Sequence, residues 1–484
     1  MIKNKMSDLG KFVIISCIVG ILNLFTYANF AASVGIVIVE ITALVFLLLK
    51  TQYDEFYCMF LIFLCMSFEF NDTVGSDVLY GFKAFEIVGI NLSLLILVFF
   101  IVFYRLRRRK ICFDKRSLDG RFIFSLLIIG FLGVFNGILS LTFNDNDIDR
   151  LSNPGGMFLG QVYLKFLMEL IIALSVYYAI RKCEDSLEKI KNCLVAILIG
   201  GIITMIVSRA SGIMGTYGGV KTLQIQNIIR YIPFLYIYSI TEKKRLTKFL
   251  VFFLSTVGMI FTLLYNATGK MLMLYAFVPI AVVFVTFKKD KKLAICEVLV
   301  FPIILLLGGT FILSDIQSST IFSSKLREVV ALFDFGPGWL KNMPVSPRVR
   351  IAEFVNVLYE YIEHPLRIIT GKGYLGTIKD HVGLITNVLD AYSVEQDRLG
   401  IFYALHESIN NLFLTNGIIG LIFIARYVIL LLKHAFKSMH AYSALFWLFF
   451  AYGFSFTLTG YGITAMMVCL YEISLENRKE KVVI

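Results

Sequence analysis

Residues 84–121 read AFEIVGINLSLLILVFFIVFYRLRRRKICFDKRSLDGR, an apolar run that ends in a dense cluster of Arg and Lys. The run is long enough to cross a bilayer once, since a transmembrane helix takes about 20 apolar residues. Basic clusters beside such runs are typical of the cytoplasmic side of a membrane. This stretch therefore predicts a transmembrane helix that ends in the cytoplasm.

The composition of the whole chain agrees with this stretch. Of 484 residues, 58% are hydrophobic and only 17% are charged, and the mean hydropathy is +0.79. Soluble domains carry about 25% charged residues, so a water-soluble globular enzyme is excluded. The 45 Phe and 24 Tyr also exclude a disordered chain. The composition indicates a polytopic membrane protein.

Apolar segments recur along the chain, and we expect an all-α fold with about 12–14 transmembrane helices. The expected segments are 11–28, 32–50, 55–70, 84–104, 121–143, 157–180, 190–207, 225–240, 247–267, 270–287, 293–313, 411–433 and a pair within 443–474. The eight cysteines lie in these segments or in loops expected inside the cell, so no disulfide framework is predicted.

The net charge of +12 is explained by topology. If the N-terminus is cytoplasmic, every strongly basic loop falls on the cytoplasmic side, which also places the C-terminus there. We therefore expect no nucleic-acid partner. The basic loops are 105–121, 181–191, 242–248, 288–292, 433–437 and the tail from 476.

The order of the expected transmembrane segments divides the chain into three parts. Residues 1–313 form the first group of transmembrane helices, 314–410 form one large external loop, and 411–484 form the last helices and a cytoplasmic tail. A loop of this length is either functional or disordered, and this one is too rich in aromatic and aliphatic residues for disorder. The loop is therefore the expected catalytic region.

Within the loop, apolar residues at helical spacing predict an amphipathic helix on the outer membrane surface. Its expected apolar face consists of Ile351, Phe354, Val355, Leu358, Tyr361 and Ile362. Glu353, Glu360 and Glu363 are expected to lie off this face.

Common signatures of nucleotide hydrolysis and zinc chemistry are absent from the sequence. Asp145, Asp147 and Asp149 alternate in an outer loop, but the Gly and the distal Glu of a calcium loop are missing. We interpret them as a solvated acidic turn and expect neither a metal nor a cofactor.

Several cations and one histidine fall on the predicted outer side. Arg209 follows one helix, Lys270 precedes another in the turn NATGK, Arg350 begins the amphipathic helix, and His406 precedes the segment 411–433. A single exposed Arg or Lys is usually just solvated. Several that converge on one membrane face would bind an anion at the level of the lipid headgroups.

Three motifs occur in this region, in order. They are TGK at 268–270, RIAEFVNVLYEYIEHPLRIITGKGYLG from Arg350, and HESINNLFLTNGIIGL from His406. Together they resemble the superfamily of O-antigen ligases and Wzy-type O-antigen polymerases over residues 200–425. The chain departs from the family pattern at Lys270, where Arg is commoner, at Phe354, where Trp is commoner, and at Glu407, where Asn or Ser is usual.

The resemblance implies a GT-C-like glycosyltransferase in the bacterial inner membrane, inverting and independent of metal. Its donor and acceptor would be undecaprenyl-pyrophosphate-linked oligosaccharides, and its partners membrane lipid and a chain-length regulator protein. Arg350 and Lys270 would bind the donor pyrophosphate, with Arg209 as a second-line cation. His406 would activate the acceptor hydroxyl.

Three functions stay open at this level. We favour a polymerase, because the predicted helices outnumber the roughly twelve that the resemblance implies for ligases. A ligase would transfer the glycan to lipid A core or to a protein instead. A flippase or exporter of the lipid-linked glycan should carry its charges inside the helices, whereas the cations singled out here fall on the outer face.

Overall fold

The computed structural model describes residues 7–26, 29–67, 69–71, 77–79, 86–87, 90–107, 114, 116–142, 147, 156–182, 185–213, 215–217, 220–222, 232, 235, 238, 245–265, 283, 287, 290–299, 336, 338–385, 392, 394–403, 405–438 and 460–482. Over these residues the fold is helical, with four short antiparallel strand pairs. The strand pairs are β1 (Glu69–Asn71) with β2 (Asp77–Leu79), β3 (Glu86–Ile87) with β4 (Ile90–Asn91), β5 (Gly215–Tyr217) with β6 (Val220–Thr222), and β7 (Ile378–Lys379) with β8 (Ile401–Phe402).

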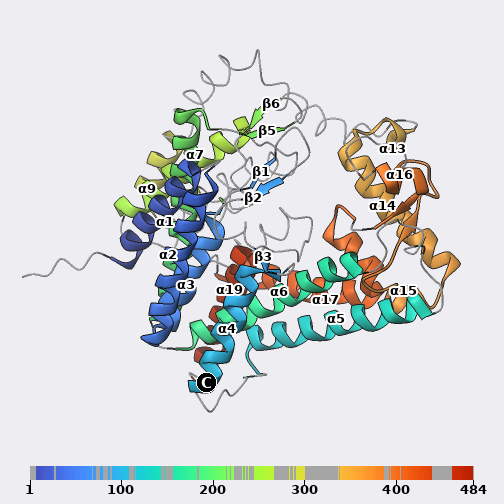
Figure 1. Ribbon diagram of the computed structural model, residues 1–484, viewed down its shortest axis with the longest axis horizontal. Coiled ribbons are helices and arrows are strands. Elements are labelled where there is room, and N and C mark those ends of the chain that lie inside the picture. The colour runs from blue at the N-terminus through green and yellow to red at the C-terminus, as the bar shows by residue number, and fades with distance from the viewer. Residues whose placement is uncertain are drawn as a thin grey trace, which may run out of the picture.

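The long helices follow the expected segments closely (Figure 1). They are α1 (Asp8–Phe25), α2 (Phe30–Leu49), α3 (Tyr53–Cys65), α4 (Leu92–Arg107), α5 (Leu118–Thr142), α6 (Gly156–Ile180), α7 (Ser186–Ser211), α9 (Arg245–Tyr265), α17 (Ser408–Ser438) and α19 (Gly460–Val482). Helix α4 begins later than the sequence predicts, because β3 and β4 occupy the start of the segment 84–104.

Five of the described helices are long and apolar enough to cross a membrane, which agrees with a polytopic membrane protein. They cover 8–25, 30–49, 118–140, 186–211 and 409–431. The expected segments 225–240, 270–287 and 293–313 and the first of the pair within 443–474 lie wholly or largely outside the described residues, so the total of about 12–14 helices stays a prediction.

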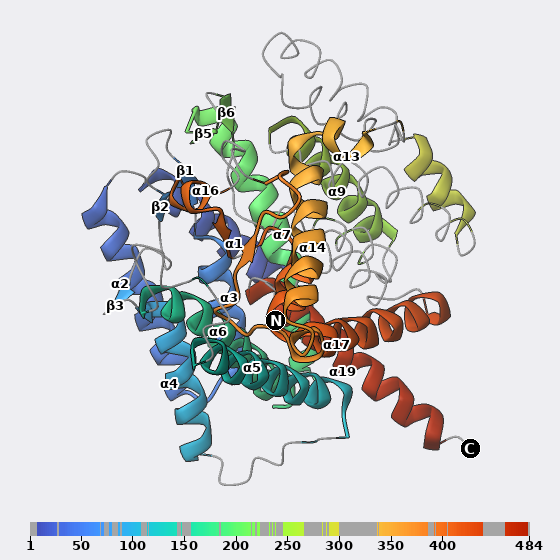
Figure 2. The ribbon, with the colours of Figure 1, turned by 90° about the vertical axis from the view of Figure 1, so that its right-hand side faces the viewer.

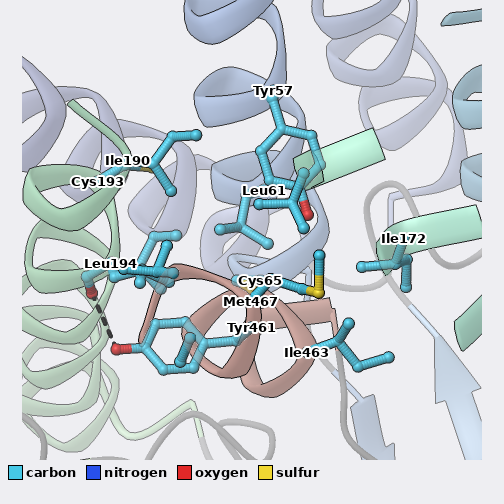
Figure 3. Packing of buried hydrophobic residues seen from close by; sticks show 14 of the residues in the cluster. Tyr57, Leu61, Cys65, Ile172, Ile190, Cys193, Leu194, Tyr461, Ile463 and Met467 are labelled. Atoms are coloured by element: carbon cyan, nitrogen blue, oxygen red, sulfur yellow. Dashed lines mark hydrogen bonds between the residues drawn. The ribbon is translucent and has the colours of Figure 1, made fainter. Parts of the chain in front are cut away.

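The main core joins α1, α3, α6, α7 and α19. Helices α1 and α7 approach closely, since a side chain at Gly200 would meet the Ser16 side chain at 2.5 Å. Figure 3 shows Tyr57 of α3 and Tyr461 of α19 packed among aliphatic side chains. The Tyr461 hydroxyl donates to the Leu194 carbonyl at 3.3 Å, so this buried hydroxyl is hydrogen-bonded.

Ion pairs join the ends of several helices that the sequence assigns to the cytoplasmic side. The first residues of α1, α3, α5 and α7 meet the last residues of α6 and α19. The ends of α5, α6, α7 and α19 lie in or beside the predicted basic loops, and those of α1 and α3 follow on the same side in the predicted order of the helices, so their assembly is consistent with one shared side. The pairs are Lys11–Glu55 (3.5 Å), Lys182–Asp54 and Lys189–Asp54 (3.0 Å each), Arg181–Asp119 (2.6 Å) and Arg478–Asp114.

A second, smaller core lies mostly within the predicted loop and also includes Phe413 and Leu414 of the expected segment 411–433. It belongs to what we call the α14 unit: α13 (Trp339–Asn342), α14 (Val345–Glu363), α15 (Arg367–Thr370), α16 (Val394–Leu399), β7, β8 and the first turns of α17. Figure 1 shows this unit at the far end of α5 and α17, away from α1 and α2, and Figure 2 views the molecule from that end. The described part of the loop is therefore an ordered unit with its own hydrophobic core.

The predicted helix over 351–362 is confirmed, but two of the glutamates off its apolar face are buried, which the sequence did not predict. Glu353 is 0% exposed and Glu360 is 3% exposed, whereas Ile362 is 72% exposed. The apolar pattern missed this because other segments of the α14 unit supply hydrogen-bond partners for both carboxylates. A buried polar group is tolerated where such partners exist.

Candidate functional site

Helix α14 presents two buried carboxylates to the rest of its unit. Glu353 and Glu360 are seven residues apart, which is two helical turns, so they share one face. Each lies at the centre of its own polar network. The first network includes Arg350 and His406, and the second includes Lys372 and His381.

Glu353 holds His406 through two hydrogen bonds. Its Oε1 accepts from the His406 backbone N–H at 2.9 Å and lies 2.6 Å from the ring Nδ1. The Tyr392 hydroxyl also donates to Oε1, and Asn410 Nδ2 donates to Oε2 at 3.0 Å. The Tyr392 ring stands edge-on to the His406 ring, with centroids 4.9 Å apart. The imidazole is therefore fixed in position and in orientation.

These contacts also favour the ionised form of Glu353. Burial by itself would raise the pKa of Glu353, but the hydrogen bonds from His406, Tyr392 and Asn410 outweigh it and hold this pKa below its ordinary value. An ionised carboxylate only accepts hydrogen bonds, so Nδ1 of a neutral His406 carries the ring proton. The lone pair is then on Nε2, and 31% of the His406 side chain is exposed. This is the arrangement of a general base with a carboxylate partner.

Arg350 lies beside this pair. Its Nε is 2.6 Å from Glu407 Oε1, and 33% of its side chain is exposed, against 10% for Glu407. Asn410 links Glu353 to Arg350, because its Nδ2 donates both to the Glu353 carboxylate and to the Arg350 carbonyl, the latter at 2.9 Å. The site thus combines an imidazole base and a guanidinium on adjoining turns of α14 and the start of α17.

The position of α17 depends on close aromatic packing. Phe354 of α14 stacks on Phe413 of α17 with centroids 5.4 Å apart, and Tyr361 meets Phe413 edge-on at 5.0 Å. Phe354, which stands where the family pattern more often has Trp, is thus a packing residue here. This contact keeps α14, which carries Arg350, at a fixed separation from α17, which begins two residues after His406.

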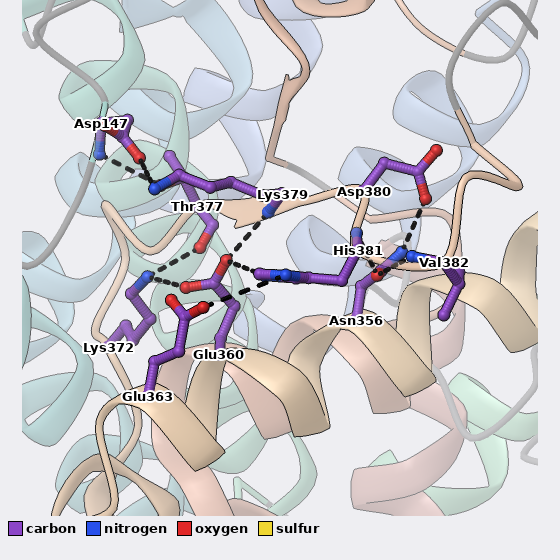
Figure 4. A network of polar contacts seen from close by, with 10 residues as sticks. All are labelled: Asp147, Asn356, Glu360, Glu363, Lys372, Thr377, Lys379, Asp380, His381 and Val382. Carbon is purple, nitrogen blue, oxygen red and sulfur yellow. Dashed lines mark hydrogen bonds and ion pairs between the residues drawn. The ribbon is translucent and has the colours of Figure 1, made fainter.

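Figure 4 shows the second network, which centres on Glu360. Its carboxylate lies 2.8 Å from Lys372 Nζ and accepts from the Lys379 backbone N–H at 2.9 Å. Lys372 also donates to the Thr377 carbonyl at 2.9 Å, and the side chains of Glu360 and Lys372 are almost wholly buried. His381 Nε2 is 3.4 Å from the same carboxylate. This network ties residues 371–381 to α14.

The glycines of the motifs have a structural explanation. Gly417 has φ +60° and ψ −149°, a conformation that essentially only glycine adopts, and it kinks α17. A side chain there would meet the Ile368 carbonyl at 2.5 Å, and one at Gly373 would meet the backbone of Gly137 at 2.0 Å. These glycines permit close backbone contact between α15, α5 and α17, so they position the site and take no direct part in it.

The structure brings together two of the four predicted site residues, Arg350 and His406. Lys270 lies outside the described residues. Arg209 is exposed at the end of α7, and Figure 1 shows α7 and the β5–β6 pair that follows it well away from α14. Lys270 and Arg209 therefore stay predictions as pyrophosphate ligands.

Sequence reasoning missed Glu353, Tyr392 and Asn410. Glu353 follows Arg350 by three residues and Asn410 follows His406 by four, so both lie inside the quoted motifs. Spacing alone does not reveal that they face each other. Tyr392 has no sequence signal, because its contact with Glu353 depends on the path of the chain between α14 and α17.

The described carboxylates do not build a convincing cation site. Asp147 of the acidic turn pairs with Lys379 at 3.1 Å, while Asp145 and Asp149 lie outside the described residues. Glu360, Glu363 and His364 offer ligand atoms within 4.8 Å of one another. However, the Lys372 ammonium already neutralises Glu360, and a metal ion there would be repelled by it.

Comparison with protein-family models, with curated proteins and with solved structures finds no match for this chain. The function is therefore inferred from the geometry of the site. A carboxylate-held imidazole beside a guanidinium can take a proton from a hydroxyl group and stabilise a neighbouring anion.

Replacing Glu353 with glutamine should lower the stability of the protein and make that stability less dependent on pH. Because the pKa of Glu353 is lowered in the folded state, its contribution to stability is complete above the unfolded pKa of about 4.3 and is lost as pH falls through the lower, folded value. We expect Glu353→Gln to cost about 2 kcal/mol at pH 7, as for hydrogen bonds to a charged group. Thermal unfolding of the purified protein between pH 7 and pH 3.5 measures both effects.

Glu363→Gln provides the control, since Glu363 lies on the same helix with 51% of its side chain exposed. Its unfolding temperature should follow that of the wild type at every pH. If the curves of unfolding temperature against pH were parallel for wild type and Glu353→Gln, Glu353 would not be held as a carboxylate by these contacts.

Proposed function

We propose that this protein is a polysaccharide polymerase of the inner membrane of a bacterium. It would transfer glycan from an undecaprenyl-pyrophosphate donor to a hydroxyl of a lipid-linked repeat unit. The observation that carries the proposal is the His406–Glu353 pair beside Arg350, in a helical protein with membrane-spanning segments. The motif resemblance around the same residues supports the choice of substrate.

The chemistry assigns one role to each group. His406 Nε2 takes the proton from the acceptor hydroxyl as its oxygen bonds to the anomeric carbon of the donor. The bond from that carbon to the pyrophosphate oxygen breaks, and the pyrophosphate leaves with the electron pair. Arg350 stabilises the charge that develops on this leaving group. Glu353 positions the imidazole and stabilises its protonated form.

The location of the reaction follows from the supply of activated sugar. Nucleotide sugars and ATP are cytoplasmic, so an enzyme that works on the outer face needs a donor with its own leaving group. A polyprenyl pyrophosphate provides one. It also keeps the substrate at the level of the lipid headgroups, where the predicted loop would lie.

The proposal is tested by the size profile of surface glycan in a strain that lacks this gene, with and without the wild-type copy. A polymerase predicts single repeat units on the final anchor in the deletion strain, and a ladder when the wild type is restored. Long chains that stay on the lipid carrier would indicate a ligase instead. Repeat units trapped on the cytoplasmic face would indicate a flippase and would contradict the assigned site.

Arg350→Ala should remove the ladder, while Arg348→Ala should keep it. Arg348 lies on the same helix, but its Nη1 donates to the Lys341 carbonyl at 3.2 Å and it is not part of the His406 network. Loss of a preorganised donor to a developing anion costs about 10²–10³-fold in rate. Glycan gels and membrane immunoblots of both variants make the comparison. Equal ladders in both would remove Arg350 from the reaction.

A further inference from the structure

The segment around α15 lies deeper along the neighbouring helices than a surface loop would. The Tyr374 backbone N–H donates to the Gly133 carbonyl of α5 at 3.0 Å, and Asn136 of α5 donates to the Thr370 carbonyl. Gly133 is seven residues before the end of the apolar span 118–140, about 10 Å along the helix.

The contacts with α17 give the same depth independently. A side chain at Gly417 would meet the carbonyls of Ile368 and Ile369 at 2.5 and 2.6 Å. Gly417 is eight residues inside the apolar span 409–431, about 12 Å from its start. Two separate helices thus place α15 inside the thickness that their apolar residues cover.

The backbone polar groups of this segment have hydrogen-bond partners within the protein, as they need in a lipid environment. Irregular backbone is tolerated at membrane depth only where the protein satisfies its polar groups. Here the backbone N–H groups of Gly371, Lys372 and Gly373 donate to the carbonyls of Arg367, Leu414 and Thr415 at 2.7, 2.8 and 3.0 Å. Ser140 Oγ of α5 donates to the Lys372 carbonyl at 2.7 Å.

Residues 362–374 carry the charged side chains of Glu363, Arg367 and Lys372, and Lys372 is neutralised internally. Lys372 is 2% exposed and pairs with Glu360 at 2.8 Å, so its ammonium does not face the surroundings. Glu363 is exposed at the start of the segment, with 51% of its side chain accessible, and an edge of exposed apolar side chains lies beside it. Ile362 is 72% exposed, Leu366 is 88% exposed and Ile369 is 56% exposed.

Exposed apolar side chains of the two spans continue this surface. On α5, Phe135 and Ile138 are 56% and 55% exposed, and on α17, Ile418 and Ile422 are 40% and 61% exposed. Such side chains on membrane-spanning helices face lipid. The exposed apolar side chains of α15 lie at the same depth as these side chains of α5 and α17.

We propose that residues 362–374 form a re-entrant wedge, whose edge of Ile362, Leu366 and Ile369 is immersed in the acyl chains of one bilayer leaflet. The leaflet is the one at which α5 ends and α17 begins. The wedge would hold the α14 unit, and with it His406, at the membrane surface. It is independent of the reaction proposed above, because it depends only on depth and exposure.

Tryptophan fluorescence in vesicles tests this wedge. Leu366→Trp and Val394→Trp introduce the reporter at two exposed positions, 88% and 86% exposed, of which the second lies on α16. Figure 1 shows α16 apart from α15. Wild type, with Trp339 and Trp447, provides the background emission. The proteins are reconstituted in phosphatidylcholine with or without bromine on the acyl chains.

Brominated chains should remove most of the added emission of Leu366→Trp and little of that of Val394→Trp. Aqueous acrylamide should show the opposite preference. Equal quenching of the two variants by bromine, or quenching of Leu366→Trp mainly by acrylamide, would overturn the proposal. If neither agent quenched the added emission of Leu366→Trp, protein would cover this edge, and the proposal would be overturned as well.

Discussion

Replacing His406 with alanine is expected to stop chain growth while leaving the protein in the membrane at wild-type amounts. The side chain is 31% exposed and makes its contacts at the edge of the α14 unit, so its loss removes little packing. The loss of a general base lowers a rate about 10²–10⁴-fold. The measurement is the transfer of glycan between purified lipid-linked repeat units by reconstituted protein, together with the glycan ladder in cells.

His364→Ala is the matched control, because His364 ends α14 in the same unit and is outside the Glu353 network. It should keep a normal ladder. If His406→Ala also polymerised at the wild-type rate, the base would have to be another group, and the proposed function would lose its main support.

Replacing Lys372 with methionine is expected to cause the largest loss of stability. The substitution leaves Glu360 buried without its ion-pair partner, and breaking a buried pair in this way costs about 3–5 kcal/mol. The α14 unit should unfold first, since Lys372 ties residues 371–377 to α14. Thermal unfolding and limited proteolysis of the purified variant measure the effect.

Two further variants separate this effect from simple loss of charge. Lys379→Met removes a more exposed partner, with 49% of the lysine side chain accessible beside Asp147, and should cost at most about 1 kcal/mol. The double variant Lys372→Met/Glu360→Leu should recover much of the stability, because no buried charge is left unpaired. If Lys372→Met were no less stable than Lys379→Met, the buried pair would not hold the unit together.

The outline of the fold could be predicted from the sequence because the relevant signals are local. Apolar runs and basic clusters give α1, α2, α5, α7 and α17 to within a few residues. The start of α4 was predicted too early, since apolar composition does not distinguish the β3–β4 pair from a helix. Lys270, several expected spans and the side of the membrane stay predictions.

The candidate site was predicted only in part. Arg350 and His406 are close together because α14 packs on the first turns of α17, and their motif positions pointed to both. The sequence placed Glu353 off the apolar face of its helix but did not predict that it is buried. An apolar pattern counts only the polarity of each residue, whereas the burial of a carboxylate depends on which donors approach it.

The sequence by itself determined that this is a helical membrane protein, because composition and apolar run length depend on no distant contact. It also determined where along the chain the unusual cations and the histidine occur. Only the tertiary structure decided which of them meet. Glu353 reaches His406 across 53 residues, and Lys372 is held between α14 and α17. Such contacts depend on the path of the chain, which brings together donors and acceptors that no local pattern joins.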